Sequence, residues 1–594
     1  MAEEREQVMK NFSYKEQEMI RAFIFTNPHG NTSFIYPQSL LAGEELPPLV
    51  SAYSRTHVPM QTRSLQFLDQ EKREQTREFL SHIAPLMDIF RLSDGTLKVS
   101  PKTQVFSSQW ILGHGHDSIK EEAQVVGVVE QVSDITGKKI TGHPLNRPQV
   151  KSTRYIDFST VLPLMLGDPD IAGLPSVDKA LSYIERMGRQ YVRFTNLITD
   201  GLLAQPVNQR GIEYLKRPEE VQKAALAWAK GQKRIDPSFE ATPEMLERQE
   251  QKILESLTGD SLRATVEKSV LDYSRLYLLA LNRTSVGFST DARTLERIIT
   301  DMISSNRVED RTRGQELWDE AKKIAPIILG PKSHIEIDQW QIETDKAMRE
   351  YLARTHLGSL HERNLLKNGT ANLLSPRDIE MYTDRFNAAL VVFPYCGAAL
   401  QDIFSALTDK DVDQVLEIAH AHRGKKGVIH PAISHGGLTV EFVMGYHGYR
   451  DLFRHRRGSR STQLLTTRLG FEVPPLYDSL GITQEYLADM KQASDLFEEA
   501  ASVNPQVAEK LVPFGANIRA MHSWQTDQMG YVGDLRTDIT KGNFSYVSTV
   551  RELLSKVSAL MPKTSKYFKV DRREFPPEVW KKIYSWYDAH ERNR

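Results

Sequence analysis

Apolar residues recur at spacings of three and four over much of the chain, and this pattern predicts a mostly helical protein. The clearest case runs from Asp178 to Leu202, where an apolar stripe marks one face of an amphipathic helix. The stripe consists of Leu181, Ile184, Met187, Tyr191, Phe194, Leu197, Ile198 and Leu202. Similar spacing predicts helices at about 216–232, 242–281, 291–304, 312–325, 376–390, 410–422, 483–501, 546–560 and 576–592.

Two short apolar runs depart from this pattern and predict buried strands. They are IRAFIFT at 20–26 and ALVVFPY at 389–395, both partly β-branched, and each would open one half of the chain. Residues 329–378 lack a persistent apolar stripe, so we expect the junction between the halves there. The expected organisation is a first domain with an N-terminal extension at 1–335, a linker at 336–378 and a second, more divergent domain at 379–594.

Charge and composition limit the classes of function. The 594 residues include 76 Lys and Arg and 77 Asp and Glu, so no global positive field attracts nucleic acid or an anionic membrane. The first residues, MAEEREQVMK, are charged where a signal peptide is apolar, and no run approaches the ~18 apolar residues of a membrane span. These features predict a soluble cytoplasmic protein. The only cysteine, Cys396, lies in an apolar run and is expected to be a buried thiol.

Two fragments about three hundred residues apart carry parts of one motif. The first is RPQVKSTRYIDFS at 147–159 and the second is YRDLFRHRRGSRSTQLLTTR at 449–468. Together they resemble the Arg-His-Arg…Ser-x-Arg signature of flavin-dependent thymidylate synthases, which methylate dUMP without a cysteine nucleophile. Further segments of residues 50–330 resemble this family in the right order. The resemblance implies a helix-rich α+β fold made of two tandem domains of this type.

The first half supplies the nucleotide-binding residues that the resemblance implies. Ser152, Thr153 and Arg154 fall on the Ser-x-Arg element, and Arg275 falls on the family's phosphate-binding arginine. Guanidinium forks beside hydroxyl groups suit a phosphate, because bidentate charge-assisted hydrogen bonds fix an anion's position. On an extended segment, Ser152 and Arg154 would point the same way.

The first half also matches parts of the flavin site. His116 and Ser118 lie in the family's His-rich segment, HGHDSIK. Asp291 replaces the asparagine of the family's flavin-contacting Asn-x-Arg element, sixteen residues after Arg275, while Arg293 is kept. The Arg-His-Arg element is damaged here, because an alignment without gaps places Gly142, His143 and Pro144 on it. Its Asn-Glu pair falls on Gln149 and Val150.

The second half shows the reverse pattern. Arg450, Arg454, His455 and Arg456 match the flavin-gripping stretch in register, and His435 lies nineteen residues before Arg454, as in the family. A two-residue insertion is needed to place Thr466 and Arg468 on the Ser-x-Arg element. Asn517 and Arg519 resemble the Asn-x-Arg element. Eleven residues past its first position, the family has the arginine that activates the uracil, but this chain has Gln528 in the second half and Met302 in the first.

The complementary losses favour a composite site. Fusing two family domains makes a pseudo-dimer, and a homodimer of such chains would rebuild the family's four-domain assembly. The second half would then bind flavin through Arg454, His455, Arg456, Asn517 and Arg519, with His116, Ser118 and Arg293 from the first half. The first half would bind the nucleotide through Ser152, Thr153, Arg154 and Arg275, with Arg450 from the second half.

The resemblance implies FAD-dependent methylation of dUMP or a related uracil nucleotide. FAD would be the cofactor, and NADPH and methylenetetrahydrofolate would be co-substrates. A degenerate nucleotide- or flavin-binding scaffold stays open, favoured by Gln528 and Met302. A phosphate- or RNA-binding protein using the basic cluster at 454–460, or a metal-dependent hydrolase using histidines such as His114 and His420, stays open as well. No glycine-rich phosphate loop follows a predicted strand.

Overall fold

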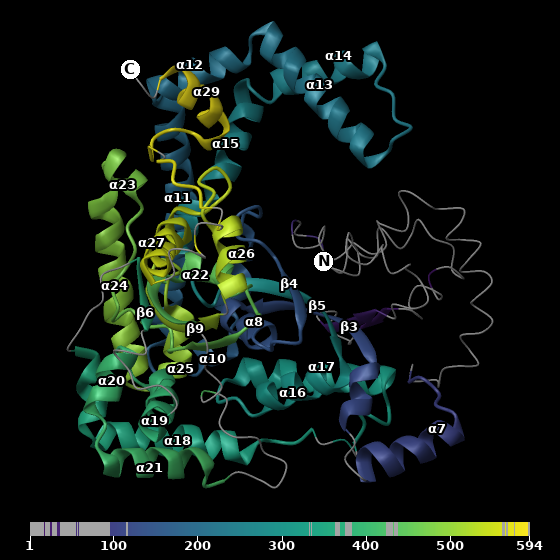
Figure 1. Cartoon of the computed structure of the whole chain (residues 1–594), viewed down its shortest axis with the longest axis vertical. Helices are drawn as coiled ribbons and strands as arrows, with labels where there is room; N and C mark the ends of the chain where they lie inside the picture. The colour runs from purple at the N-terminus through teal and green to yellow at the C-terminus, as the bar shows by residue number, and fades with distance from the viewer. Residues whose placement is uncertain are drawn as a thin grey trace.

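The computed structural model of the chain describes most residues from 96 onward and a few before them. The described residues are 17, 24–26, 32–35, 55, 58, 96–113, 117–331, 333, 335–362, 369–374, 383–422, 432, 438–524, 526–560, 565, 568, 570–574 and 576–591. Many helices surround two small antiparallel sheets (Figure 1). The helix-rich α+β class expected from the sequence is therefore confirmed.

The two sheets share one topology. The first has the order β1-β2-β3-β5-β4 and the second the order β6-β7-β9-β8. The first sheet's strands are β1 (Ile24–Thr26), β2 (Thr32–Ile35), β3 (Gln124–Ser133), β4 (Arg147–Val150) and β5 (Arg283–Asp291). The second sheet's strands are β6 (Thr370–Leu374), β7 (Leu438–Gly445), β8 (Ser459–Thr462) and β9 (Asn517–Trp524). The strands β3 and β7 hold equivalent places in the two sheets, and each is followed by a short helix. These helices are α8 (Asp134–Thr141) after β3 and α22 (Tyr446–Leu452) after β7.

The register of the strands shows which residues of the two halves are equivalent. Ser133 pairs with Arg283 at the end of β3, and Gly445 pairs with Asn517 at the end of β7. Arg147 pairs with Ser289, and Ser459 pairs with Ser523. Residues 133–150 therefore map onto 445–462 by a shift of 312, and β5 maps onto β9 by a shift of 234. His143 and His455 are equivalent, as the alignment of the two fragments predicts.

A shared apolar core joins the halves through their long helices. The sequence pattern at 178–202 forms α11 (Val177–Ala204), and the pattern at 483–501 forms α24 (Thr483–Ala501). The Phe194 and Tyr277 rings lie 4.5 Å apart, and Tyr277 lies 5.6 Å from Tyr486 of the other half. Burying large aromatic rings from both halves in one cluster removes much apolar surface from water. The halves are therefore packed as one body.

The remaining helices cover the sheets or extend from them. Helices α16 and α17 pack on the first sheet, whereas α18, α20 and α21 pack beside the second (Figure 1). Helices α13 and α14 project away from the body at the upper right. The bounds of the helices in the first half are α7 (Pro101–Phe106), α9 (Leu162–Leu166), α10 (Pro169–Ala172), α12 (Pro206–Leu215), α13 (Pro218–Ile235), α14 (Pro243–Glu255), α15 (Gly259–Ser274), α16 (Ala292–Ile303) and α17 (Val308–Ile324). Those that follow are α18 (Gln339–Arg354), α19 (Asp384–Val392), α20 (Leu400–Ala406), α21 (Asp409–His420), α23 (Pro475–Ser479), α25 (Pro505–Ala508), α26 (Thr526–Arg536), α27 (Phe544–Leu560) and α29 (Tyr584–His590).

The structure corrects two expectations. Residues 389–395 are not a strand, because α19 runs through Val392 and a short 3-10 helix follows at Phe393–Tyr395. The Thr383 hydroxyl caps α19 by accepting a hydrogen bond from the Phe386 amide at 3.1 Å. The range 336–378 is not a plain linker either, since it contains α18 and β6. Helix α18 packs its Met348 into a core cluster that includes Met521 of β9, and β6 pairs with β7.

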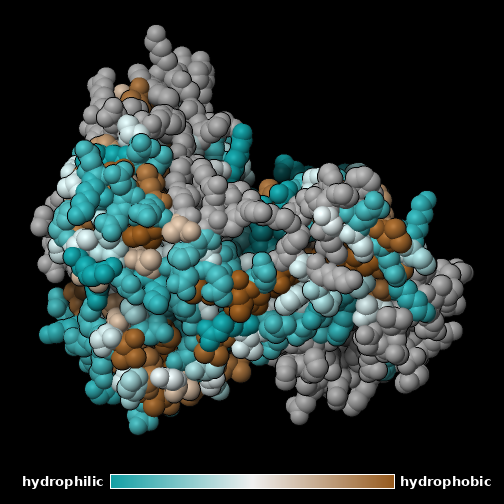
Figure 2. Space-filling model, turned by 90° about the horizontal axis from the view of Figure 1, so that it is seen from below, coloured by the Kyte–Doolittle hydropathy of each residue, from teal (hydrophilic) through white to brown (hydrophobic). Residues whose placement is uncertain are grey.

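The described surface is mixed in character. Figure 2 shows hydrophobic side chains on one face as small patches between hydrophilic ones. Within the described residues, no helix combines the length and apolar character needed to cross a bilayer. Cys396 is a buried free thiol, as expected, and burial raises its pKa to about 11. A thiol in this state is a poor nucleophile at neutral pH.

Candidate functional site

The Ser-Thr-Arg segment of the first half forms a tight turn rather than the extended segment expected from the sequence. The amides of Tyr155 and Ile156 donate hydrogen bonds to the Ser152 carbonyl oxygen at 3.2 and 3.1 Å. The turn follows β4 and buries Thr153, which is 2% exposed. Since the chain reverses here, Ser152 and Arg154 are placed by the turn and not by strand alternation.

Thr153 is the point where the two halves meet at this site. Its hydroxyl oxygen accepts a hydrogen bond from Nη1 of Arg275 at 3.2 Å and another from Nη1 of Arg450 at 2.8 Å. Arg275 comes directly after α15 in the first half, and Arg450 lies on α22 in the second. Three residues predicted to bind the nucleotide are thus in direct contact, across the boundary between the halves.

Arg154 is held in the same place by a carboxylate. Its Nε and Nη2 atoms donate to the two oxygens of Asp272 at 2.8 and 2.9 Å. Its Nη1 lies 3.4 Å from the Tyr546 hydroxyl, and its Nη2 donates to the Lys541 carbonyl oxygen at 2.9 Å. Asp272 on α15 and Tyr546 on α27 therefore orient the guanidinium from both halves.

Two aspartates lie among the arginines of this cluster. Burial alone would raise the pKa of Asp272, but the charges of Arg154 and Arg275 outweigh it and hold that pKa well below its usual range. Asp451 is also buried, and the charges of Arg454 and Arg275 lower its pKa. Both carboxylates are therefore ionised at neutral pH. They balance part of the positive charge gathered here.

The cluster retains capacity for a further anion. Arg275 is 1% exposed, and its Nε donates no hydrogen bond to any described residue. A buried guanidinium donor without a partner costs about 1–3 kcal/mol. Besides Arg154 and Arg275, Arg454 and Arg536 contribute positive charge at Asp451. Phosphate oxygens would match both the free donor and the excess positive charge.

His455 is engaged with an arginine that the sequence did not indicate. The ring nitrogen Nε2 of His455 accepts a hydrogen bond from Nε of Arg536 at 2.9 Å, so this nitrogen carries no proton. Burial, and then the Arg536 charge, lower the pKa of His455 to about 3. His455 is therefore a neutral support for Arg536. The Arg536 guanidinium also lies over the Tyr546 ring at 5.3 Å, next to the Arg154 contact.

This neutral histidine predicts a stability that depends on pH. The folded pKa of about 3 lies below the unfolded value near 6.5, so the unfolded state binds the extra proton as pH falls below about 6.5. Between pH 7.5 and 5.0, His455 should therefore account for a loss of roughly 2 kcal/mol in the free energy of unfolding. His455→Gln, which cannot titrate here, is expected to lose correspondingly less over this range. Urea unfolding at both pH values measures the difference.

A matched control is His422→Gln, because His422 is exposed. Its loss between the two pH values should equal that of the unmodified chain. Equal losses in the unmodified chain and in His455→Gln would contradict a neutral His455.

Strand register changes which residues of the two halves are equivalent around Asn517 and Asp291. Asn517 begins β9 and pairs with Gly445, so its equivalent in the first half is Arg283 and not Asp291. Asp291 instead ends β5 and caps α16, accepting a hydrogen bond from the Thr294 amide at 2.8 Å. The same shift of 234 places Arg536, not Gln528, opposite Met302. Gln528 and Met302, which the sequence comparison placed at the same family position, are therefore not equivalent in the two halves.

Those residues predicted to bind flavin that the structure describes do not form one site. Asn517 and Arg519 are buried inside the second sheet, where Nη1 of Arg519 lies 2.5 Å from Glu441. Arg293 pairs with Glu121, which belongs to the same 3-10 helix as the exposed Ser118. His116 lies outside the described residues, as does His435. Of the predicted residues that the structure describes, Arg454 and Arg456 line a pocket.

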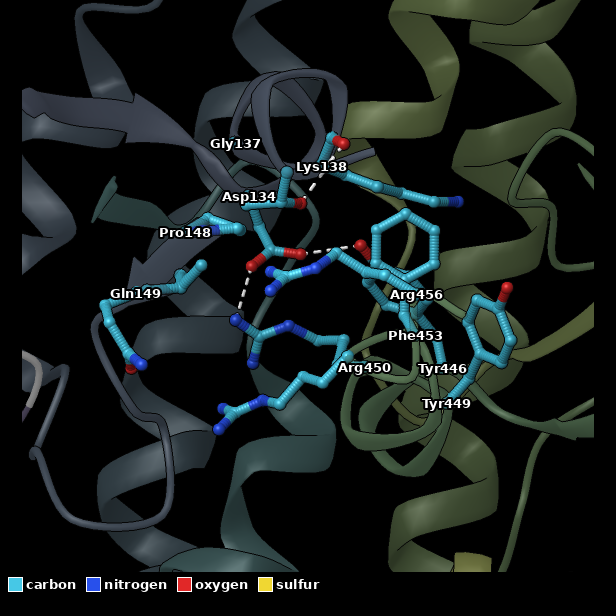
Figure 3. Close-up of a pocket in the computed structure, with 13 residues that line it drawn as sticks. Asp134, Gly137, Lys138, Pro148, Gln149, Tyr446, Tyr449, Arg450, Phe453 and Arg456 are labelled. Carbon is cyan, nitrogen blue, oxygen red and sulfur yellow. Dashed lines mark hydrogen bonds and ion pairs between the residues drawn. The ribbon is translucent and has the colours of Figure 1, made fainter. Parts of the chain in front are cut away.

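That pocket has a volume of about 230 Å³ and lies between the halves. Figure 3 shows α8 and β4 of the first half on one side of it and α22 of the second half on the other. Asp134 accepts hydrogen bonds from Arg450 and from the Tyr446 hydroxyl, both at 2.6 Å. The residues that line the pocket are Asp134, Gly137, Lys138, Thr141, Pro148, Gln149, Val150, Tyr446, Tyr449, Arg450, Phe453, Arg454 and Arg456.

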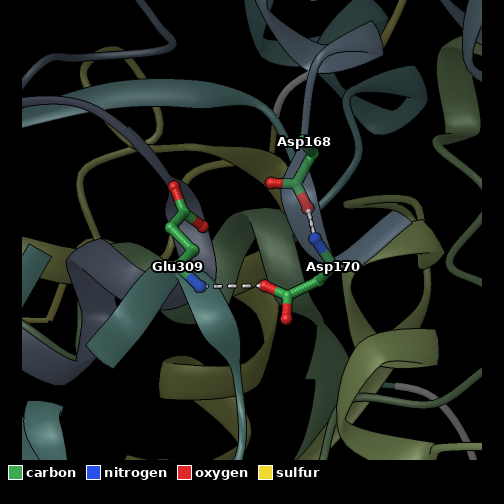
Figure 4. A group of neighbouring side chains, drawn as sticks. All are labelled: Asp168, Asp170 and Glu309. Atoms are coloured by element: carbon green, nitrogen blue, oxygen red, sulfur yellow. Dashed lines mark hydrogen bonds between the residues drawn. The ribbon is translucent and has the colours of Figure 1, made fainter. Parts of the chain in front are cut away.

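A separate group of three buried carboxylates has the spacing of a metal site but holds a lysine. Asp168, Asp170 and Glu309 have oxygen atoms within 4.8 Å of one another (Figure 4). Nζ of Lys510, from the second half, lies 2.8 Å from an oxygen of each. Burial alone would lower the pKa of Lys510, but these carboxylates outweigh it and raise that pKa. The charged amine therefore occupies the place a cation would take.

Sequence reasoning missed three residues that shape the site. Asp272 lies one helical turn before Arg275, so an acidic residue at that spacing was a usable signal. Arg536 is found only by counting from the strand ends, which needs the strand register. Lys138 does not belong to any of the motifs found in the sequence, and its place in the pocket follows only from the fold.

Comparisons with known proteins give relatives without a stated activity. The chain is 25% identical to a UPF0159 protein of Chlamydia muridarum over 340 residues, which is 56% of this chain and 62% of the relative. It is 25% identical to a UPF0159 protein of Chlamydia pneumoniae over 341 residues, 56% of this chain and 62% of the relative. A UPF0159 protein of Thermoplasma acidophilum is 22% identical over 325 residues, 54% of this chain and 63% of the relative. The match spans less than two thirds of the length of each of these relatives. No family model and no solved structure matches the chain.

Proposed function

We propose that the chain binds a uracil nucleotide such as dUMP where Thr153, Arg154 and Arg275 meet Arg450, and methylates it in an FAD-dependent reaction. The observation that carries the nucleotide part is the double contact on Thr153 from Arg275 and Arg450. Methylenetetrahydrofolate would donate the one-carbon group and NADPH the hydride, as the resemblance to flavin-dependent thymidylate synthases implies.

The chain's own residues have distinct tasks in this proposal. Arg154 and Arg275 neutralise the phosphate, and Arg275 has an unused buried donor for one of its oxygens. Arg536 is equivalent by strand register to Met302, at which the resemblance places the first half's uracil-activating position, and would activate the uracil here. His455 fixes its orientation through one hydrogen bond. Because His455 stays neutral, it accepts this hydrogen bond throughout the physiological pH range.

The fit to FAD is weaker than the fit to the nucleotide. Arg454 and Arg456 border the pocket between the halves and suit a pyrophosphate. Asn517 and Arg519 are buried in the sheet, and Arg293 is paired elsewhere. The described residues therefore do not form the predicted flavin site, and no reaction step is assigned to the flavin. This dispersal favours a second candidate function, a nucleotide-binding protein that makes no thymidylate.

One experiment separates these functions. The purified chain is loaded with FAD, its absorbance is recorded from about 300 to 500 nm, and dUMP is titrated into it. We expect bound flavin, a spectrum that shifts with dUMP, and thymidylate after NADPH and methylenetetrahydrofolate are added. Binding of dUMP in calorimetry without bound flavin would support the second candidate. Absence of dUMP binding would overturn both.

The same resemblance predicts a homodimer of chains, with four domains in a pseudo-tetramer. The two halves of one chain already share a core, so each chain would supply one half of that assembly. Light scattering on the purified chain measures the mass directly.

A further inference from the structure

Lys138 lies in the pocket between the halves under unusual conditions for a lysine. Its amine is 5.7 Å from the centroid of the Tyr446 ring, 5.9 Å from that of Tyr449 and 5.8 Å from that of Phe453. Its Nζ donates a hydrogen bond to the Thr462 hydroxyl oxygen at 3.2 Å. Within the described residues, it forms no ion pair with a carboxylate. Aromatic faces stabilise an ammonium only in part when it loses its water shell.

Burial lowers the pKa of Lys138 to about 8, an effect that Glu509 and Asp134 reduce and that Arg307 and Arg460 increase. An exposed lysine titrates near 10.4, so its amine is almost entirely protonated at pH 8. About half of the Lys138 amine is then neutral and carries a free electron pair. A desolvated lysine of this kind is the usual nucleophile toward carbonyl compounds.

The other lining residues of the pocket favour a negatively charged ligand. Arg450, Arg454 and Arg456 line it, whereas Asp134 is its one acidic lining residue and is already held by Arg450 and Tyr446. The volume of about 230 Å³ suits a small ligand. The shift of 312 makes Lys138 equivalent to Arg450, so an amine and a guanidinium enter one pocket from equivalent places in the two halves.

We propose that Lys138 captures a small anionic carbonyl compound, an aldehyde or a keto acid, in this pocket as a reversible imine. The neutral nitrogen attacks the carbonyl carbon, and one of the two nitrogen protons moves to the former carbonyl oxygen to give a neutral carbinolamine. The nitrogen then loses its second hydrogen, the hydroxyl group leaves, and both depart as water while the C=N bond forms. The step is neither an oxidation nor a reduction. The pocket shares Arg450 with the proposed nucleotide site, but the inference does not require that a nucleotide binds there.

Reductive trapping tests this inference. The full chain is incubated at pH 8 with glyoxylate and cyanoborohydride, which reduces the imine to a stable amine, and the modified lysines are identified by peptide mass spectrometry. We expect Lys138 to react at least about tenfold faster than Lys179 and Lys223, whose side chains are 70% and 76% exposed, since far more of its amine is neutral. Its rate should fall about tenfold when the pH is lowered from 8 to 6.7 or so.

Two comparisons make the result specific. Lys139 is next to Lys138 and also has a pKa lowered by burial, but it does not line the pocket, and its amine donates to the Asp301 carbonyl oxygen at 2.6 Å. It should stay unmodified, and Lys138→Arg should abolish the fast labelling while keeping a cation against the rings. Acetaldehyde, which has no charge, should show a smaller preference for Lys138 than glyoxylate. Labelling of Lys138 no faster than Lys179, or equal labelling of Lys139, would overturn the inference.

Discussion

Replacing Lys510 with methionine is expected to lower the free energy of unfolding by about 3–5 kcal/mol, because three buried carboxylates lose their shared cation. Its Nζ contacts Asp168, Asp170 and Glu309 at 2.8 Å each, and its side chain is 0% exposed. Removing one partner of a buried ion pair leaves uncompensated charge in a medium that solvates it poorly. Urea unfolding monitored by circular dichroism measures the loss as a lower transition midpoint.

The same variant should regain part of its stability in acid. An orphaned buried carboxylate takes up a proton as pH falls, and the protonated form costs less to bury. The deficit of Lys510→Met relative to the unmodified chain is therefore expected to be smaller at pH 5 than at pH 8. A matched control is Lys179→Met, whose exposed ion pair with Glu499 should contribute less than about 1 kcal/mol. A deficit for Lys510→Met no larger than that of the control would show that the buried pairs do not stabilise the fold.

Lys510 also explains why the two halves behave as one body. It comes from the 3-10 helix before β9, while its three carboxylate partners all belong to the first half. Arg307 of the first half pairs in turn with Glu509 of the second at 3.0 Å. Within the first half, Arg283 also pairs with Asp168 and Glu309, and Arg307 with Asp310. Lys510 and Glu509, by contrast, have their ion-pair partners across the boundary, so separating the halves would leave these two buried charges without them. The packing of the aromatic core and this charge network therefore act together.

The helices were predictable because their apolar faces are long and regular. Helices α11 and α24 both bury one face against the other half, and the 3.6-residue period of that face is visible in the sequence. The strand predicted at 389–395 was wrong for a related reason. A short run that is apolar at every position has no period, so its sequence does not distinguish a buried helix from a buried strand. Helix α19 is buried along most of its length, which removes the polar positions that would have marked it as a helix.

The central strands escaped prediction because they are buried on both faces. Every residue of β9 is buried, and β7 is buried at all but its first position. Strands of this kind lack the alternation of apolar and polar residues that identifies a half-exposed strand. Without the strand ends, the shifts between the halves were not available. This is why Gln528 was compared with Met302 in place of Arg536.

The candidate site was predictable as a set of arginines but not as a geometry. Ordered motifs identified Thr153, Arg154, Arg275 and Arg450, and the structure brings these four together. Their partners, such as Asp272 for Arg154, lie more than a hundred residues away in the chain. The pairing of residues so far apart in the chain depends on how distant segments pack and leaves no signature in the sequence around Arg154. The turn at Ser152 was missed for the opposite reason, since it is local but contains no glycine or proline to mark it.

The proposed nucleotide site predicts a selective loss of affinity in arginine variants. Arg154→Gln and Arg275→Gln should each weaken dUMP binding roughly 10- to 150-fold, which corresponds to about 1.5–3 kcal/mol for a hydrogen bond to a charged group. Deoxyuridine has no phosphate, so its affinity should change less than about twofold. Calorimetric titration with both ligands measures the difference. Arg189→Gln is the control, because Arg189 is exposed and pairs only with Glu185 on its own helix among the described residues.

The comparison with deoxyuridine separates ligand binding from folding. Arg275 is buried, so its loss also disturbs Asp272 and Asp451, and a distorted fold would weaken dUMP and deoxyuridine alike. Equal losses for both ligands would therefore contradict a phosphate role, as would unchanged dUMP binding.

Arg454 extends the test to the second half with little risk to the fold, since its side chain is 55% exposed and its closest approach to Asp451 is 3.6 Å. If the site is shared between the halves, Arg454→Gln should weaken dUMP binding at least about threefold, because a charge at the edge of the cluster still attracts the phosphate. Arg457→Gln, an exposed neighbour outside the pocket lining, should leave the affinity unchanged. A loss in Arg154→Gln together with no loss in Arg454→Gln would confine the phosphate to the first half. The second half would then contribute to the site through Arg450, Arg536 and the contacts of Tyr546 and Lys541 with Arg154.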